Sequence, residues 1–443
     1  MTIQTSSRPE TVQSSPELVD LVSACPCPAC GHQVAVPFYE GGAQPLATLA
    51  WPRSAEEARS MKRLPLAFRR CVECGHVYNT AFDYKEVPYS QNPNRMFNRG
   101  RLWQEHLCRV RNLIVERLPP YPTVIEIGCG DGHFLQALAQ AGPAGYYIGF
   151  DPNSAAGTAT HQVEIHRTLF DPLTHLAEYR PDMIISRHVL EHLMNPLGFM
   201  QLLAFAASWH EVEADLFLEV PCIDRVFETG RTTDFYYEHN SHFTTTSFTH
   251  LLQRCADVVE LVERGYNDEV IYGLARIGVH PAQARCAREA IAFRNQALAM
   301  RTTIRQTLEQ YIAAGKTIAI WGGTGKAAAL INSLGLDADR FPLVVDSDPE
   351  KVGTFVPGTG QEIRFRDHLL LQPADIILIA TQWRAQDIVL EIEQHHIPYQ
   401  QILLEYRGRL VDYFADEHPY KLSASRALCN EKGSHHGHHR NRV

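Results

Sequence analysis

Two pairs of cysteines have the spacing of metal ligands. Cys27 and Cys30 form one C-x-x-C-G knuckle, and Cys71 and Cys74 form a second. Each tight turn places two thiolates on one side, and four thiolates complete a closed tetrahedral zinc site, which is structural because no position stays open. The pairs lie further apart than in compact zinc ribbons, and Cys25 is an alternative ligand to Cys27. A redox pair is the rival interpretation, but the βαβ context of such pairs is missing here.

Residues 234–243, DFYYEHNSHF, are dense in titratable side chains. A histidine beside a carboxylate, as in Glu238–His239, can accept a proton near neutral pH. The hydroxyl of Tyr236 can donate a hydrogen bond to a developing oxyanion. His192, in VLEHL, follows another strand, and we expect it to converge on the same sheet edge. The rival interpretation is a polar surface turn.

A glycine-rich loop, EIGCGDG at residues 126–132, follows an apolar strand and opens a helix. Its glycines let a ligand approach the backbone, and the helix start offers free N–H groups. Asp151 closes the next strand, 19 residues beyond Gly132, where a carboxylate can accept both hydroxyl protons of a ribose. The spacing is G-x-G-x-G and not the G-x-G-x-x-G of dinucleotide folds. The loop therefore indicates an adenosine ligand, with an ordinary strand-to-helix turn as the alternative.

Alternating strands and helices must position these groups. After the amphipathic helix EHLCRVRNLIVERL, the segments TVIEIG, YYIGFDPN, DMIISRH and ADLFLEVP predict buried strands of a parallel sheet. The pattern restarts at KTIAIWGG after a long proline-free helix. The predicted fold class is therefore α/β, with a small four-cysteine zinc domain, a central Rossmann-like domain and a second, smaller C-terminal Rossmann-like domain. We expect the following divisions: a disordered arm 1–24, a zinc-binding domain 25–85, a central domain 86–275, a linking helix 276–315, a C-terminal α/β domain 316–415 and a tail 416–443.

A second glycine loop lies in the C-terminal lobe. Gly323, Gly325 and Ala328 fit G-x-G-x-x-A, and Asp346 ends the next strand. Taken alone this is a weak dinucleotide motif, so NAD is a rival ligand. It is not a Walker phosphate loop, because Ala327 stands where that loop needs Ser or Thr.

Composition limits the function classes. The net charge of −9 disfavours a protein whose main partner is nucleic acid. No apolar run approaches the ~18 residues of a membrane span, and the polar start lacks a secretory core. We expect a cytoplasmic protein with a small-molecule substrate, whose oligomeric state the sequence leaves open.

Several motifs resemble those of a known family. EIGCGDG, FDPN and SRHVLEHL resemble class I S-adenosylmethionine-dependent methyltransferases. YYEHNSHFT resembles the Y-x-E-H-x-S-Y-F-S stretch of bacterial C-methyltransferases that act on nucleotide-linked keto-deoxysugars. That family also has an N-terminal four-cysteine zinc domain and a C-terminal α/β domain, matched here by WGGTGKAAALIN and VVDSDPEKVGTFVPGTG. The resemblance extends from about residue 25 to about residue 410.

The resemblance implies roles for individual residues. It implies S-adenosyl-L-methionine contacts from Glu126, Gly128, Cys129, Gly130, Asp151, Asp171 and His188. For Asp171 a helix cap before Pro172 is the alternative. Catalytic candidates are Tyr89, His192, Tyr236, Glu238 and His239, and candidates for holding the nucleotide are Thr324, Lys326 and Asn332. The chain departs from the family at Ala327–Ala328, at Gly360–Gln361–Glu362, and at His242, which replaces a tyrosine.

The implied chemistry is carbon methylation next to a ketone. His239 or Glu238 would remove the proton, Tyr236 and His192 would stabilise the enolate oxygen, and the carbanion would attack the sulfonium methyl group. Two alternatives stay open. One is a C-, O- or N-methyltransferase for a non-sugar metabolite, and the other is a catalytically inactive zinc-ribbon binding protein.

Overall fold

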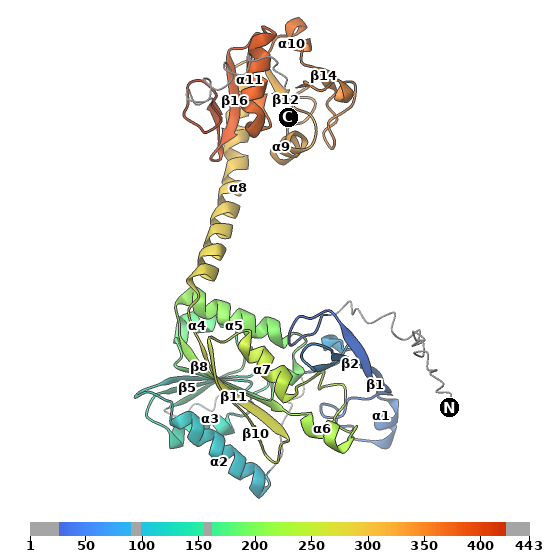
Figure 1. Ribbon diagram of the computed structural model, residues 1–443, viewed down its shortest axis with the longest axis vertical. Coiled ribbons are helices and arrows are strands. Elements are labelled where there is room, and N and C mark those ends of the chain that lie inside the picture. Colours follow the sequence, from blue (N-terminus) through green and yellow to red (C-terminus); the bar gives the residue numbers. More distant parts are fainter. Residues whose placement is uncertain (1–25, 90–98, 155–161, 422–443) are drawn as a thin grey trace, which may run out of the picture. The chain divides into compact units, whose positions relative to one another are not determined.

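The computed structural model describes residues 26–89, 99–154 and 162–421. It divides into two compact units between Cys286 and Ala287 (Figure 1), and each unit is described by itself. The predicted arm, the alternative ligand Cys25 and the predicted tail beyond residue 421 lie outside the described residues. Within the described part, no helix has the length and apolar character needed to cross a membrane.

A seven-stranded sheet forms the centre of the first unit, in the order β10-β11-β8-β7-β4-β5-β6. Neighbours from β6 to β8 are parallel, whereas β11 and β10 are antiparallel to their neighbours. Its strands are β4 (Thr123–Ile127), β5 (Tyr146–Phe150), β6 (Val163–His166), β7 (Met183–Arg187), β8 (Ala214–Pro221), β10 (Val258–Gly265) and β11 (Val270–Ile277).

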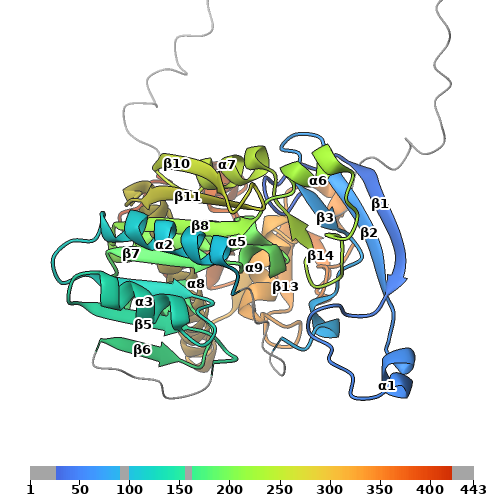
Figure 2. The same ribbon diagram turned by 90° about the horizontal axis from the view of Figure 1, so that it is seen from below.

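Helices cover both faces of this sheet (Figures 1 and 2). Side chains of β4 alternate between the faces: Ile125 and Ile127 join one buried cluster with α4, α5 and α7, and Val124 joins the other with α2 and α3. Burial on both faces explains why the parallel strands are continuous apolar runs in the sequence. The helices of the unit are α1 (Ala55–Ser60), α2 (Arg101–Val115), α3 (His133–Ala141), α4 (Pro172–Tyr179), α5 (Pro196–His210), α6 (Asp224–Thr229) and α7 (Thr245–Gln253), with short 3₁₀ turns η2 (Tyr84–Glu86) and η3 (Leu190–His192).

A smaller antiparallel sheet carries the cysteine knuckles, in the order β1-β2-β3-β9. Its last strand comes from a distant part of the sequence: Val77 of β3 pairs with His242, and Tyr78 pairs with Ser241. This pairing attaches the segment just before residue 241 to the small sheet. The strands are β1 (Ala35–Gln44), β2 (Leu64–Cys71), β3 (Val77–Asn79) and β9 (Ser241–His242).

The second unit contains a six-stranded sheet in the order β14-β13-β12-β15-β16-β17, parallel except for β17. Ile318 and Ile320 of β12 face one buried cluster, and Ala319 and Trp321 face the other. Its strands are β12 (Ile318–Trp321), β13 (Leu343–Asp346), β14 (Ile363–Phe365), β15 (Ile376–Ile379), β16 (Gln401–Tyr406) and β17 (Arg409–Asp412). The helices are α8 (Pro281–Ala313), in which the two units divide, α9 (Lys326–Leu334), α10 (His368–Leu371) and α11 (Ala385–Gln394), with turns η4 (Pro349–Lys351) and η5 (Gln382–Arg384).

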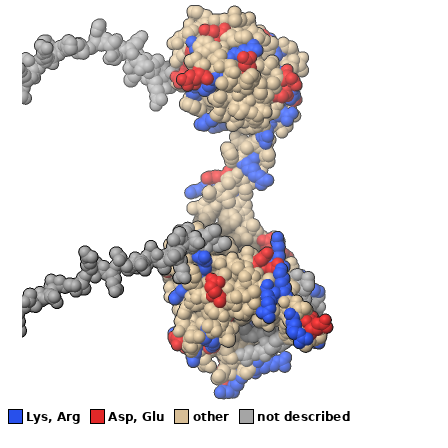
Figure 3. All heavy atoms as spheres, turned by 90° about the vertical axis from the view of Figure 1, so that its right-hand side faces the viewer, with Lys and Arg blue, Asp and Glu red and all other residues tan. Residues whose placement is uncertain are grey.

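Charged side chains of both signs are interspersed over the described residues on the face shown in Figure 3. Lys and Arg side chains occur beside Asp and Glu side chains on each unit. This face therefore offers a mixed surface instead of an extended field of one sign.

The predicted α/β fold class is confirmed, with the four-cysteine cluster on the small sheet and two α/β sheets after it. The antiparallel strands β10 and β11 were not foreseen. They form a hairpin whose turn contains Tyr266, Asn267 and Asp268, all with positive φ. None of these three positions is the glycine that usually signals such a turn, although Gly265 precedes them. The predicted domain boundaries stay predictions.

Candidate functional site

The loops that follow β4, β5, β7 and β8 meet at one edge of the central sheet, because the carboxyl ends of parallel strands share an edge. Gly128 has φ +72°, and its N–H donates to the carbonyl of Phe150 at 2.8 Å. A Cβ at Gly128 would lie 2.3 Å from Cγ2 of Val189, so the glycine loop packs directly on the loop after β7. A Cβ at Gly130 would meet open space, which leaves room for a ligand against the backbone.

Asp151 ties the glycine loop to the end of β5. Its Oδ2 accepts from the N–H of Gly130 at 2.9 Å, and its Oδ1 accepts from the N–H of Asn153 at 2.8 Å. Each oxygen has a second lone pair. The carboxylate is therefore held in place and can still accept hydroxyl protons from a ligand.

Two further predicted cofactor residues of the glycine-loop segment, Glu126 and Cys129, are buried. Burial raises the pKa of Glu126 to about 8, and Asp151 adds to this, against the lowering effect of Arg187. Glu126 Oε2 makes no hydrogen bond among the described residues. Cys129 packs against Gly149, where a Cβ would lie 2.5 Å from its sulfur, and burial raises the pKa of its thiol. Cys129 thus has a packing environment and not that of a reactive thiolate.

A buried charge network that sequence analysis missed lies beside the glycine loop. Glu219, fully buried on β8, accepts from Arg187 at 2.8 Å and contacts His106 Nε2 at 2.6 Å and His188 Nε2 at 3.1 Å. Although burial alone would raise the pKa of Glu219, Arg187 and the two histidines hold it well below its usual range. The sequence contains one indication of this network, which is Glu219 inside the otherwise apolar strand LFLEVP. A carboxylate buried in such a strand requires charged or hydrogen-bonding partners.

His188 occupies a left-handed backbone conformation, with φ +55°. Its ring lies between two carboxylates, with Nδ1 3.5 Å from Glu191 and Nε2 3.1 Å from Glu219. Burial by itself would lower the pKa of His188, but hydrogen bonds with Glu191 and Glu219 outweigh it and raise the pKa to about 9. This predicted cofactor residue is therefore a half-buried cation at neutral pH.

The predicted catalytic side chains meet at the same edge. The Tyr236 hydroxyl lies 2.7 Å from His239 Nε2, and the rings of His192 and His239 have centroids 4.7 Å apart. The Tyr89 hydroxyl lies 3.0 Å from His192 Nδ1 and donates to the carbonyl of Glu238 at 2.8 Å. The structure thus brings together two tyrosines and two histidines from three segments of the chain.

Glu238 holds another loop in place. Its Oε1 accepts from the N–H of Thr48 at 2.7 Å and from the N–H of Leu49 at 3.1 Å. The side chain is fully buried, so these bonds are shielded from water. This carboxylate fixes the predicted catalytic segment to the loop after β1.

The glycine loop and the catalytic cluster are neighbours. Asn153, two residues after Asp151, donates from its side-chain amide to the carbonyl of Tyr89, whose hydroxyl contacts His192. Asp151 and His239 are therefore linked by a continuous series of residue contacts at one edge of the sheet.

Asp171 is exposed, and its side chain caps α4 by accepting from the N–H of Leu173. This is the helix-cap alternative that the sequence left open for Asp171.

The four cysteines form a buried cluster, with Sγ atoms 3.7 Å apart for Cys27 and Cys74 and 3.6 Å apart for Cys30 and Cys71. Tetrahedral Zn–S bonds of ~2.3 Å require sulfurs roughly 3.8 Å apart. Gly31 and Gly75 have φ of +79° and +75°, as the knuckle turns require. The spacing and donor type fit a zinc ion.

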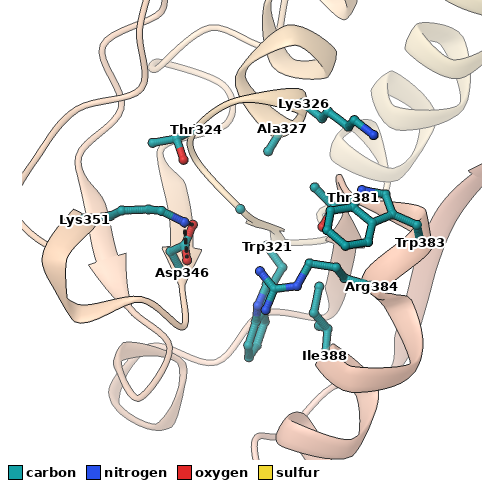
Figure 4. Close-up of a pocket in the computed structure, with 11 residues that line it drawn as sticks. Trp321, Thr324, Lys326, Ala327, Asp346, Lys351, Thr381, Trp383, Arg384 and Ile388 are labelled. Carbon is teal, nitrogen blue, oxygen red and sulfur yellow. Dashed lines mark hydrogen bonds and ion pairs between the residues drawn. The ribbon is translucent and has the colours of Figure 1, made fainter.

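A pocket of about 230 Å³ lies at the carboxyl edge of the sheet in the second unit (Figure 4). Thr324 and Lys326 line it, and Lys326 Nζ lies 5.4 Å from the ring centroid of Trp383. Asp346 is paired with Lys351 at 3.2 Å, so the carboxylate that a dinucleotide fold would use for ribose already has a cationic partner.

Two other positions singled out in the sequence lie outside the pocket lining. Asn332 donates to the carbonyls of Ala328 and Pro357, at 2.8 Å each. Gln361 is buried and donates to the carbonyl of Leu336 at 2.7 Å. Both side chains satisfy backbone groups of the fold, so the departure at Gln361 changes the interior and not the pocket.

Comparison with known proteins assigns both α/β regions. Residues 99–255 match a family model described as a methyltransferase domain, and residues 282–404 match one described as a C-methyltransferase C-terminal domain. The C-methyltransferase NovU of Streptomyces niveus is 25% identical over 365 residues, covering 75% of this chain and 84% of NovU.

Solved structures also resemble part of the chain. Magnesium protoporphyrin IX methyltransferase from Synechocystis PCC 6803, with bound SAH, is 16% identical with a TM-score of 0.29, over 40% of this chain and 84% of that one. The 1,6-didemethyltoxoflavin-N1-methyltransferase of Burkholderia thailandensis is 13% identical with a TM-score of 0.30, over 41% and 82%. We base no argument about function on these two solved structures. The inferences about function use the two family models and NovU.

We predict that Gly128→Ala weakens S-adenosylhomocysteine binding by at least roughly tenfold, or about 1.4 kcal/mol. The added Cβ would clash with Val189 and strain a backbone at φ +72°. Calorimetry measures the affinity. Gly230→Ala is the control, because Gly230 has a similar φ of +66° but open space around it. An unchanged affinity in Gly128→Ala would contradict the loop's assignment to the cofactor.

We predict one zinc ion per chain, lost in Cys74→Ser because only three thiolates remain. Elemental analysis after gel filtration gives the ratio, and thermal unfolding should begin at lower temperature in the variant. Cys108→Ser, at an exposed cysteine, should keep the metal. A metal-free wild-type protein purified without chelators would refute the site.

We predict that His188 stabilises the fold in its protonated form. Because its folded pKa of about 9 exceeds the unfolded ~6.5, its contribution is complete below ~6.5 and is lost as the pH rises to about 9. The difference in unfolding free energy between wild type and His188→Gln, from urea titrations, should therefore shrink by a few kcal/mol at most over this range. A difference that grows with pH would contradict the assignment.

Proposed function

Because the chain carries an S-adenosylmethionine-dependent methyltransferase domain followed by the C-terminal domain of C-methyltransferases, we propose that it methylates the carbon next to a ketone of a nucleotide-linked deoxysugar. The likeness to the C-methyltransferase NovU supports carbon as the methylated atom. The observation that carries the proposal is the contact of half-buried His239 with Tyr236 and His192, beside the glycine loop.

His239 is the proposed base. Burial, and then the neighbouring His192 and His242, lower the pKa of His239 well below its usual range. The ring is therefore neutral at pH 7 and keeps a lone pair that can accept the proton next to the ketone. Glu238, the other candidate, already accepts two backbone N–H groups through Oε1, which suits it better to positioning the segment than to proton transfer.

Tyr236 is the proposed donor to the enolate oxygen, while Tyr89 and His192 both donate to the carbonyl of Glu238 and position the segment. Burial raises the pKa of both Tyr89 and Tyr236, so both hydroxyls stay protonated. His192 Nδ1 lies 2.8 Å from the carbonyl of Glu238, and since a carbonyl only accepts, that nitrogen carries a proton. Donors fixed in a buried site stabilise developing negative charge without reorganising.

The edge beside these groups fits the methyl donor. Gly128 and Gly130 leave the backbone open, Glu126 offers a buried oxygen without a partner among the described residues, and Asp151 has lone pairs for ribose hydroxyls. When bound, S-adenosylmethionine supplies an electrophilic methyl group. The chain's part is to hold the acceptor carbon in line with it at ~3 Å and to exclude water.

The second unit's pocket supports a nucleotide handle on the acceptor. Besides the paired Lys351 and Asp346, Lys326 and Arg384 bring cationic groups to it, and Trp383 offers an aromatic face (Figure 4). A nucleoside diphosphate carries the complementary anionic charge and a base that stacks on aromatic rings. In this proposal the methyltransferase unit performs the chemistry, and the second unit recognises the nucleotide.

We predict that wild-type protein exchanges the proton next to the ketone of a nucleotide 4-keto-deoxysugar for deuterium in deuterated water. His239→Asn should lower this rate by roughly 10²–10⁴-fold, the usual contribution of a general base, while S-adenosylhomocysteine affinity stays within twofold because His239 is not part of the glycine loop. Proton NMR follows the exchange.

His396→Asn, at an exposed histidine with φ +51° that asparagine tolerates, is the matched control and should exchange at the wild-type rate. Exchange at the wild-type rate in His239→Asn would show that His239 is not the base. Absence of exchange in wild-type protein that binds the nucleotide sugar would refute the enolate mechanism.

A further inference from the structure

Three side chains at the catalytic edge form a set of metal ligands distinct from the cysteine cluster. Glu191, His192 and His239 each offer one ligand atom, and these atoms lie within 4.8 Å of one another. Two imidazoles and a carboxylate are the donors that first-row divalent metals prefer. His–zinc bonds are ~2.0–2.1 Å. Side-chain rotations that move each ligand atom by about 1 Å would therefore bring the three atoms within bonding distance of one ion.

Glu191 supplies an independent indication of a ligand. Its side chain is 2% exposed, and its Oε2 is buried without a hydrogen-bond partner among the described residues. Its Oε1 lies 3.5 Å from His188 Nδ1. A buried carboxylate oxygen without a partner costs free energy, and a cation beside it would remove that cost.

The two histidines are oriented as metal ligands usually are. His192 Nδ1 donates to the carbonyl of Glu238 at 2.8 Å, which places the lone pair on Nε2. The Tyr236 hydroxyl contacts Nε2 of His239 at 2.7 Å and leaves Nδ1 as the other nitrogen. Such outer contacts fix the tautomer of a ligating ring.

We propose that Glu191, His192 and His239 bind one divalent transition-metal ion of the zinc type, and that this ion inhibits the enzyme. Three protein ligands leave a fourth position open to water or acceptor. A metal bound to His239 occupies a ring nitrogen, and its charge opposes protonation of the ring. The inhibition rests on the proposed role of His239 as base, whereas the binding does not.

Binding is tested with cobalt on the purified, zinc-containing protein. Titration with CoCl₂ should give one further equivalent per chain, with visible d–d absorption and without the thiolate charge-transfer band that the cysteine site would give. Glu191→Gln should weaken this binding by more than the ~10–100-fold typical of outer-contact losses. Glu213→Gln, at an exposed glutamate, is the matched control. His239→Asn provides a second ligand variant, and circular dichroism checks that each protein is folded.

The site would be overturned if the wild-type protein bound no further equivalent of cobalt, or if both Glu191→Gln and His239→Asn bound it as tightly as wild type.

Inhibition is tested by deuterium exchange of the acceptor. Zinc chloride at a level that fills the second site should lower the exchange at least tenfold, and EDTA should restore it. Unchanged exchange with the site filled would overturn the inhibition. Absence of exchange in EDTA-treated wild-type protein would instead count against the proposed function, and the cobalt result would still decide the site.

Discussion

The segment that carries the proposed base depends on anchors that lie outside the central sheet. Between β8 and β9 this segment contains only α6 and turns, yet it carries Tyr236 and His239. Glu238 fixes this segment to the backbone of Thr48 and Leu49, and β9 pairs with β3 immediately after it. One anchor is the loop after β1, and the other is β3 of the small sheet that carries the cysteine knuckles. The buried cysteine cluster lies in the same small domain as these anchors, close in the chain to the support of the proposed base.

A second constraint is the buried charge of Glu219. Its partners come from α2, from the end of β7 and from the loop beyond it, so one carboxylate orients three segments at the edge where the glycine loop lies. The left-handed backbone of His188 costs about 1–2 kcal/mol for a residue with a side chain, and its two carboxylate partners offset that cost. By fixing His188, the network also holds the next residue, Val189, against Gly128 of the glycine loop.

Features encoded within a few residues were predictable from the sequence. The knuckles Cys27–Cys30 and Cys71–Cys74 and the loop from Gly128 to Asp151 depend on local turns, and alternation of apolar strands with helices gave the fold class. Features that depend on distant partners were not predictable. The sequence could not show that Glu238 would accept from Thr48, that Glu219 would hold Arg187 and His188, or that β10 and β11 would form a hairpin with no glycine at its three turn positions. Such contacts are set by packing, which single-sequence periodicity does not report.

The pairing of β3 with β9 has a consequence for biosynthesis. Val77 and His242 are 165 positions apart along the chain, so this contact is strongly non-local and cannot form before residue 242 has been synthesised. On a ribosome the cysteine ligands emerge early, but β3 stays an open sheet edge until nearly the whole first unit has been translated. Open edges invite pairing with other chains. The nascent protein is therefore most prone to aggregate during this interval, before the first unit is complete.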